Sequence, residues 1–594
     1  MNQPVTVNEC KTVISNVNET FKLPIYYNSK KVEIKQNIIT DLELINTIDE
    51  SCNPIYSYFL NTENDVSSKI SEQISRYYTT DISFLEDNQK LIKRYTSPTN
   101  ISPDYSNIIR IWDELKGETS FKDKYSYIDW EMFEFLNKSE VFLQLMSMYN
   151  LLSPLLSLVM PIFILIVPFF IIKLKGLNLT IEEYVDVLKV VAQTNAIGKL
   201  FTSNFTTMKP QDAIYIIISA AFYVFSIYQN IISCIKFYNN MKTIHSYFND
   251  IKSYLTITIE AMENYTRFSK DLKTHSEFHT VIQSKINTLN EMNQKLNSIT
   301  EYNLYKINTY KEIGNVLKYF YELYSNVEYE NAIVYSVGFH GYIDCIEGLQ
   351  KNILERKINY AKFHKKNKKG KGPNYKKHKE NIFKNSYYAN LINGKPIKNT
   401  IHFDKNQIIT GPNASGKTTI LKSTLINIIL TQQFGCGFYD SADFSPFKHI
   451  HCYLNIPDTS GRDSLFQAEA RRCKEILDVI NDNKGDSHFC VFDEIYSGTN
   501  PEEAANSATA FMLYLQKYKN VSSMLTTHFI DVCKNLNKTK SIQNSRMASE
   551  KKGNTITYLY KLEPGISEIR GGIHVLSEMN YPKEILEHNN NNTI

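Results

Sequence analysis

The sequence lacks paired cysteines and a large net charge. Its nine cysteines are scattered over 594 residues, and none belongs to a CxxC pair. This spacing argues against a structural zinc site and against the disulfide framework of a secreted protein. The 66 Lys and Arg residues nearly balance 62 Asp and Glu residues, and the formal charge of +4 does not mark a nucleic-acid-binding protein. A chain of this length predicts about two to four domains.

Proline is absent and glycine is scarce between residues 240 and 360. Apolar residues recur there at helical spacing, which predicts long helices. Residues 1–145 also have a mostly helical pattern, and no chemistry can be assigned to them from the sequence.

Two runs of the chain carry no charged residue. Leu151–Ile172 is 22 residues long and purely apolar apart from two serines, whereas Ala213–Ile235 also contains Ser, Tyr, Gln and Asn. Each run is long enough to cross the hydrocarbon of a bilayer. Pro154, Pro161 and Pro168 recur every seven residues in the first run. They share one helix face and each removes an amide hydrogen bond, which predicts a kinked helix or a re-entrant hairpin.

We interpret the two runs as a hydrophobic helical hairpin in a membrane, and the alternative is a pair of unusually apolar core helices. A lysine-rich segment, His364–Lys379, follows later in the chain and holds eight lysines. It predicts an exposed loop, which could contact phosphates of DNA, acidic lipid headgroups, or solvent alone.

A glycine-rich loop follows a predicted strand at Asn406–Thr410 and precedes a helix-like segment. Its spacing, GxxxxGK[ST], aims successive backbone amides at phosphates beside a helix N-terminus. Lys417 would reach the β and γ phosphates, and Thr418 would hold Mg²⁺. The sequence therefore predicts ATP binding with Mg²⁺ through residues Gly411, Pro412, Asn413, Ala414, Ser415, Gly416, Lys417, Thr418 and Thr419.

Two further predicted strands end in polar side chains. His488–Phe492 is followed by Asp493 and Glu494, and Ser523–Thr527 is followed by His528. Strand ends of this kind face the ligand in parallel sheets. We expect Asp493 to anchor Mg²⁺, Glu494 to orient or deprotonate the attacking water, and His528 to sense the γ phosphate.

Taken together, these motifs resemble a known family. TGPNASGKTT, FDEIYSGT and TTHF are similar to the Walker A, Walker B and switch-histidine motifs of MutS, the DNA mismatch repair ATPases, in the same order. The segment Ser460–Arg472 resembles the one in which a serine, here Ser464, reaches across a dimer to the partner's ATP. Phe466 and Glu469 fall at matching places, and Ile556–Leu586 is similar to the closing segment of the family's ATPase.

The resemblance implies an α/β ABC-type P-loop ATPase domain at the C-terminus, preceded by a mostly α-helical region with the hydrophobic hairpin. It also implies a homodimer through the ATPase domain, with Ser464 acting in trans, and DNA as a partner. Two features depart from the family: Arg570 and Gly571 replace its usual residues, and no GxFYE-like mismatch-reading segment is found. The expected domains are 1–145 (mostly helical), 146–240 (hydrophobic hairpin), 241–395 (lever-like helices ending in the lysine-rich loop) and 396–590 (ATPase).

Two functions remain open at this point. The first is a MutS-like ATPase that couples hydrolysis to DNA binding, and the second is a membrane-anchored mechanochemical ATPase that acts on a protein or lipid partner. Residues 151–172 and 213–235 would attach the chain to a membrane with the ATPase domain in the cytosol. Lysines near these runs do not favour that orientation, and a soluble cytoplasmic or nuclear protein is the alternative.

Overall fold

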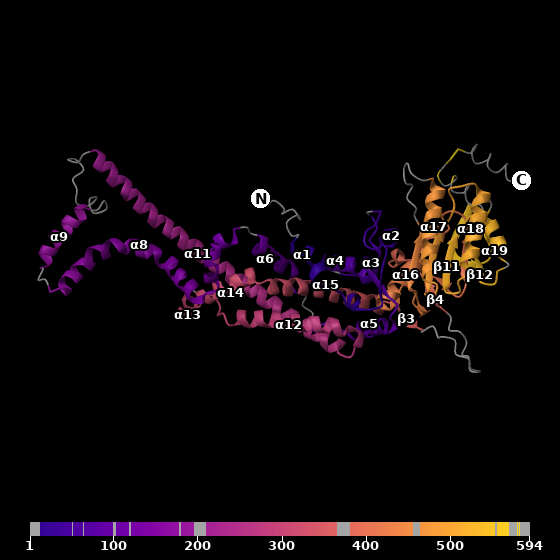
Figure 1. Ribbon diagram of the computed structural model, residues 1–594, viewed down its shortest axis with the longest axis horizontal. Coiled ribbons are helices and arrows are strands. Elements are labelled where there is room, and N and C mark those ends of the chain that lie inside the picture. Colours follow the sequence, from indigo (N-terminus) through magenta and orange to yellow (C-terminus); the bar gives the residue numbers. More distant parts are fainter. Residues whose placement is uncertain are drawn as a thin grey trace. The chain divides into compact units, whose positions relative to one another are not determined.

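The computed structural model describes most of the chain, and Figure 1 shows its helices and strands. The described residues are 12–49, 51–62, 65–98, 103–117, 120–176, 180–194, 210–303, 305–364, 381–454, 464–537, 539–552, 555–569, 576, 579, 581 and 582. The lysine-rich segment beyond His364 and the departure from the family at residues 570 and 571 therefore lie outside the described residues.

The chain divides into two compact units, each assembled from separate stretches of sequence. Unit 1 comprises residues 1–13, 101–260 and 286–333, and unit 2 comprises residues 14–100, 261–285 and 334–594. The long helices predicted between residues 240 and 360 are present. Within this stretch of the sequence, the boundaries between the two units fall inside these helices.

Helices build the described part of unit 1, and aromatic side chains fill its core. Phe121 stacks on Tyr324 with ring centroids 4.0 Å apart, and the Tyr127 hydroxyl donates to the Leu317 carbonyl at 2.7 Å. The elements are α6 (Tyr105–Gly117), α7 (Phe121–Lys124), η2 (Glu131–Lys138), α8 (Glu140–Leu174), α9 (Ile181–Thr194), most of α11 (Pro210–Ser269), the second half of α12 (Ser276–Asn297), α13 (Ile307–Lys311), α14 (Ile313–Ser325) and the start of α15 (Val327–Leu354).

The two charge-free runs lie in α8 and α11. The first run does not turn back on itself, because α8 is one helix that bends along its length (Figure 1), as prolines would cause. Both helices are long and apolar enough to cross a membrane, although a soluble core helix can meet the same two criteria. Many of the described large apolar side chains of these runs are nevertheless exposed, for example Leu155 at 58% and Phe222 at 70%.

The N-terminal part of unit 2 packs closely on α15. A Cβ on Gly348 would lie 1.7 Å from the Leu60 carbonyl oxygen, so only glycine allows this approach. Asn352 donates from Nδ2 to the Phe59 carbonyl at 2.9 Å. The elements are α1 (Thr12–Thr20), η1 (Pro24–Tyr27), β1 (Lys31–Glu33), α2 (Gln36–Asp41), α3 (Ile55–Leu60), α4 (Asp65–Ile74), β2 (Tyr77–Thr79), α5 (Ile82–Arg94) and η3 (Lys273–His275).

A six-stranded mixed sheet forms the centre of the C-terminal region, in the order β13-β12-β6-β11-β10-β9. Its strands are β6 (Asn406–Thr410), β9 (His449–Tyr453), β10 (His488–Asp493), β11 (Val521–Thr526), β12 (Ile542–Lys552) and β13 (Thr555–Pro564). All neighbours pair in parallel except β12 and β13. The three strands predicted from the sequence are confirmed as β6, β10 and β11, and their carboxyl ends meet at one edge.

Four helices accompany this sheet: α16 (Lys417–Phe434), α17 (Leu465–Asp482), α18 (Pro501–Leu515) and α19 (Ile530–Leu536). Side chains of α17, α18 and α19 join those of β10 and β11 in one buried apolar cluster. A second sheet has the order β5-β4-β8-β3-β7, with β3 (Asn359–Phe363), β4 (Ile382–Ser386), β5 (Asn399–His402), β7 (Cys436–Gly437) and β8 (Ser441–Phe444). The sequence pattern did not indicate these strands, which are only two to five residues long.

Candidate nucleotide-binding site

The glycine-rich loop connects β6 to α16 and requires its glycines. Gly416 has φ 92° and Ala414 has φ 61°, a left-handed conformation that costs little only for glycine. A Cβ on Gly411 would lie 2.6 Å from Ser415 Oγ. The loop therefore keeps its backbone exposed to a ligand at the N-terminus of α16, where unpaired amides and the helix dipole favour an anion.

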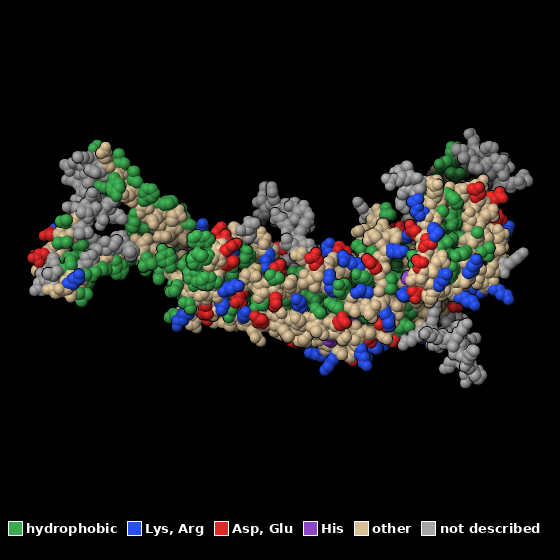
Figure 2. Space-filling view, in the orientation of Figure 1, with side chains coloured by type: hydrophobic (Ala, Val, Ile, Leu, Met, Phe, Trp, Pro, Cys, Tyr) green, Lys and Arg blue, Asp and Glu red, His purple; other side chains and the backbone are tan. Residues whose placement is uncertain are grey.

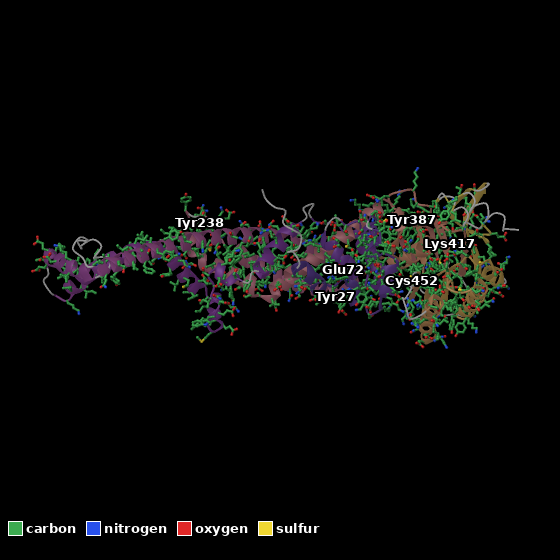
Figure 3. The ribbon with its side chains drawn as sticks, turned by 90° about the horizontal axis from the view of Figure 1, so that it is seen from above. Tyr27, Glu72, Tyr238, Tyr387, Lys417 and Cys452 are labelled. Carbon is green, nitrogen blue, oxygen red and sulfur yellow. The ribbon has the colours of Figure 1, made fainter. Side chains whose placement is uncertain are left out.

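Lys417, labelled in Figure 3, is the first residue of α16. It is 6% exposed. Its Nζ donates to the carbonyls of Gly411 at 3.0 Å and Pro412 at 3.3 Å. Glu494 Oε1 lies 3.7 Å from the same Nζ. Burial lowers the pKa of Lys417, and the charges of Glu494 and Asp493 oppose that effect. The ammonium group thus lies folded back on its own loop.

At the sheet edge, Asp493 of β10 binds hydroxyl groups from α16 and β11. Thr418 Oγ1 donates to Asp493 Oδ2 at 2.8 Å, and Thr526 Oγ1 donates to Asp493 Oδ1. Hydroxyl and carboxylate oxygens are ligands that Mg²⁺ prefers. Ser415 Oγ is buried and has no hydrogen-bond partner among the described residues. A buried hydroxyl without a hydrogen-bond partner is energetically costly unless a ligand supplies that partner. These residues therefore fit a bound Mg²⁺–phosphate group.

Glu494 and His528 are hydrogen-bonded to each other beside Asp493. His528 Nε2 lies 2.7 Å from Glu494 Oε1, and both side chains are partly exposed. The hydrogen bond from His528 lowers the pKa of Glu494, and the nearby charge of Lys417 acts in the same direction. Glu494 has φ 52°, while its amide donates to the Thr526 carbonyl at 3.1 Å. A strained backbone of this kind at a strand end is common at functional sites.

Ser464 lies at the N-cap of α17, apart from these contacts. Its hydroxyl accepts from the Gln467 amide at 3.3 Å, and its own amide donates to Gln467 Oε1 at 3.0 Å, forming a capping box. The side chain is exposed at the start of the helix. The structure thus brings together Lys417, Thr418, Asp493, Glu494 and His528, and it places Ser464 on a different helix within the same chain.

Two residues at this site were not given a role from the sequence. Thr526 binds Asp493, and the only signal for it is its place just before Thr527 and His528 at a strand end. Glu469 is 3% exposed and accepts from the Ser497 amide at 3.1 Å and the Gly498 amide at 3.2 Å. It therefore ties α17 to the loop that follows Glu494.

Comparisons with known proteins match the part of the chain that carries this site. The family model of MutS domain V matches residues 407–593. Over residues 407–593, here called the MutS segment, the chain is therefore similar to the MutS family. The resemblance inferred from the motifs is thereby confirmed for this MutS segment.

The curated relatives match the same part of the chain. A DNA mismatch repair protein MutS of Streptococcus mutans is 29% identical over 195 residues, which are 32% of this chain and 22% of that protein. Two proteins of the same name from Streptococcus pyogenes are 28% identical over 196 residues, again 32% of this chain and 22% of each relative. The chain thus matches about a fifth of the length of these MutS relatives.

The hydrogen bond between His528 and Glu494 gives a prediction about stability and pH. Because the folded pKa of Glu494 is lowered, the pair stabilises the protein above the ordinary carboxyl pKa of 4.5, and this contribution is lost as the pH falls. We expect His528→Ala to lower the free energy of unfolding at neutral pH by at most about 1 kcal/mol, since both side chains are solvated. Urea unfolding at a series of pH values should show the difference shrinking below pH 4.5.

His449→Ala is a positive control, because His449 contacts Asp486 at 3.1 Å and, after Lys448, helps to lower the pKa of that carboxyl, so its effect should also shrink as the pH falls. An effect of His528→Ala that does not depend on pH would contradict the assigned interaction.

Proposed function

We propose that the MutS segment binds ATP with Mg²⁺ and hydrolyses its terminal phosphoanhydride bond. The observation that carries this proposal is the meeting of Lys417, Thr418, Asp493, Glu494 and His528 at the carboxyl ends of three parallel strands. In the proposed complex the loop amides and Lys417 bind the phosphates, for which Lys417 must leave the carbonyls of Gly411 and Pro412.

Thr418 and Asp493 would hold Mg²⁺, which supplies charge neutralisation for the phosphate that is transferred. Glu494 would orient a water molecule and accept its proton. The lowered pKa of Glu494 means that its carboxylate is ionised at neutral pH and can orient the water by accepting a hydrogen bond, although the same shift makes it a weaker base. His528 holds Glu494 by a hydrogen bond and would follow the state of the γ phosphate through that contact.

The second part of the proposal is an ABC-type arrangement of two chains that share their sites. Ser464 is exposed at a helix N-terminus, a position that suits binding to the γ phosphate of a partner chain. Glu469 on the same helix binds the loop after Glu494. Movement of α17 on dimer closure would therefore shift the loop after Glu494 and with it the carboxylate of Glu494 in the same chain.

Glu494→Gln tests the hydrolytic role. We expect ATP binding to persist and turnover to fall at least about 100-fold, because the amide cannot accept the proton of the attacking water. Nucleotide binding is measured by fluorescence titration and turnover by phosphate release. Glu475→Gln, on the exposed face of α17, is the control and should retain both. Normal turnover in Glu494→Gln would remove this residue from the proposed mechanism.

Complementation tests the shared site. A Ser464→Ala chain and a Lys417→Ala chain are each expected to be inactive as homodimers. In a mixed dimer, Lys417 of one chain faces Ser464 of the other, so one intact site is formed. Statistical mixing of equal amounts should restore about one quarter of wild-type phosphate release. If mixtures stay as inactive as either variant alone, Ser464 does not act in trans.

The target of the ATPase has two candidates. DNA is suggested by the relatives, which are described as DNA mismatch repair proteins. A membrane is favoured by the exposed apolar side chains of α8 and α11. In this second arrangement the chain is attached through residues 151–172 and 213–235, with the MutS segment in the cytosol.

Phosphate release by the full chain, measured with and without duplex DNA, separates the two. If DNA is the target, DNA should stimulate hydrolysis, and the stimulation should decline steeply with salt as phosphate contacts are screened. If DNA does not change the rate of hydrolysis at low salt, DNA is excluded as the target and the membrane is the remaining candidate.

A further inference from the structure

The prolines of α8 leave backbone groups without their usual partners. A proline has no amide hydrogen, so the carbonyl four residues earlier loses its helical hydrogen bond. Pro154 and Pro161 therefore cannot serve the carbonyls of Asn150 and Ser157. In water such a carbonyl is satisfied by solvent, whereas in hydrocarbon it must be satisfied by the protein.

Hydroxyl groups of the protein donate hydrogen bonds to both of these carbonyls. Ser153 Oγ donates to the Asn150 carbonyl at 3.0 Å within α8. The Tyr223 hydroxyl of α11 donates to the Ser157 carbonyl at 2.8 Å. The second bond joins two helices at the place where Pro161 creates the vacancy.

A third hydroxyl lies beside Pro168. The Phe169 amide donates to the Tyr184 hydroxyl of α9 at 2.9 Å, and the rings of Phe169 and Tyr184 are 4.4 Å apart. Tyr184 is 6% exposed on an otherwise solvated helix. Each of the three prolines in the apolar run thus has a hydroxyl hydrogen-bonded to the backbone next to it or one turn before it.

The remaining surface of this region is apolar. Figure 2 shows hydrophobic side chains along α8 and the start of α11, with charged side chains gathered at α9. Phe170 is 58% exposed and Val224 is 64% exposed. The 22 residues of the first run span about 33 Å as a helix, close to the roughly 30 Å of bilayer hydrocarbon.

The two helices run antiparallel and contact each other at residues 151–157 of α8 and 223–234 of α11, beyond which they diverge (Figure 1). Tyr223 contacts Ser157, while Cys234, further along α11, lies with its sulfur 3.9 Å from the Leu151 carbonyl, further back in α8. Between them, α9 begins with a capping box in which Glu183 accepts from the amide and hydroxyl of Thr180. Its acidic first turn and neighbouring Lys189 suit an aqueous headgroup layer rather than hydrocarbon.

We propose that α8 and the first part of α11 form a two-pass hairpin in a lipid bilayer. The Tyr223 hydroxyl joins the two passes at the carbonyl that Pro161 leaves free, and the Tyr184 hydroxyl joins α9 to the far end of α8. The length of the run, its apolar surface and the internally satisfied carbonyls at Pro154 and Pro161 agree on lipid as the occupant. This inference rests on the membrane attachment proposed above and is independent of the nucleotide chemistry.

The test compares Tyr223→Phe with the wild-type full chain reconstituted in phosphatidylcholine–phosphatidylglycerol bilayers. Removing only the hydroxyl should lower the equilibrium constant for folding in an SDS titration by about threefold, the effect of an interhelical hydrogen bond in a membrane. Pro161→Ala restores an amide donor for Ser157, so Tyr223→Phe should have little further effect in that background. Tyr215→Phe, an exposed tyrosine of the same helix, is the control and should match the wild type.

Flotation with the same liposomes tests the bilayer itself. The wild-type chain should float, and Phe222→Lys, which places a charge on a 70% exposed apolar position, should float less. A wild-type chain that stays soluble without detergent, whether as a monomer or as an oligomer with the apolar runs buried between copies, would overturn the bilayer proposal.

If the chain floats but Tyr223→Phe behaves as the wild type in both backgrounds, the hydroxyl contact is wrong and the attachment stands. Phosphate release is measured on the same samples. Its absence in floating protein would count against the ATPase proposal alone.

Discussion

Helix α16 is the element on which the rest of unit 2 depends, because it is buried almost from end to end and its polar groups all have to be satisfied inside the protein. Its first residue, Lys417, belongs to the glycine-rich loop. At its last turn, Gln433 donates to the carbonyls of Ile74 and Tyr77 and accepts from the Tyr56 hydroxyl. Gln432 donates to the Thr79 carbonyl at 3.2 Å. A buried amide left unpaired costs about 1 to 3 kcal/mol, so these bonds fix where the helix ends and, through its rigid length, where the loop lies.

The chemistry of the site follows from strand order. Because β6, β11 and β10 are adjacent and parallel, the residues that follow them meet at one edge, and Asp493, Glu494 and His528 become neighbours although the chain separates them. Thr526 fixes Asp493, and His528 fixes Glu494. The result is a set of anionic oxygens beside an anion-binding helix terminus, an arrangement that favours a cation and a phosphate together.

The local features of the MutS segment could be predicted from the sequence, and the tertiary ones could not. The strand at Asn406–Thr410, the strand ends at Asp493 and His528, and the helix start at Ser464 all have signals within a few residues. Residues 14–100 hold α16 in place through contacts between segments that are more than 300 positions apart in the sequence, for example between Tyr56 and Gln433. Strands such as Cys436–Gly437 are too short to show the alternation of apolar and polar residues by which a strand is recognised in a sequence. Glu469 was placed by resemblance, but its bonds to Ser497 and Gly498 depend on packing.

The apolar runs show the same division. Their length and lack of charge predicted a hairpin, but the pairing of Tyr223 with Ser157 is a contact between distant segments that no local pattern encodes. The nucleotide site belongs to unit 2 and the apolar runs belong to unit 1. For the nucleotide site, we propose that the residues around α16 hydrolyse ATP in a site shared by two chains. The most direct measurement is phosphate release by the purified wild-type chain at varied Mg²⁺ and protein concentration. We expect phosphate release to require Mg²⁺, and its rate to rise more steeply than in proportion to protein concentration when that concentration is low. Absence of Mg²⁺-dependent release at any concentration would contradict this proposal.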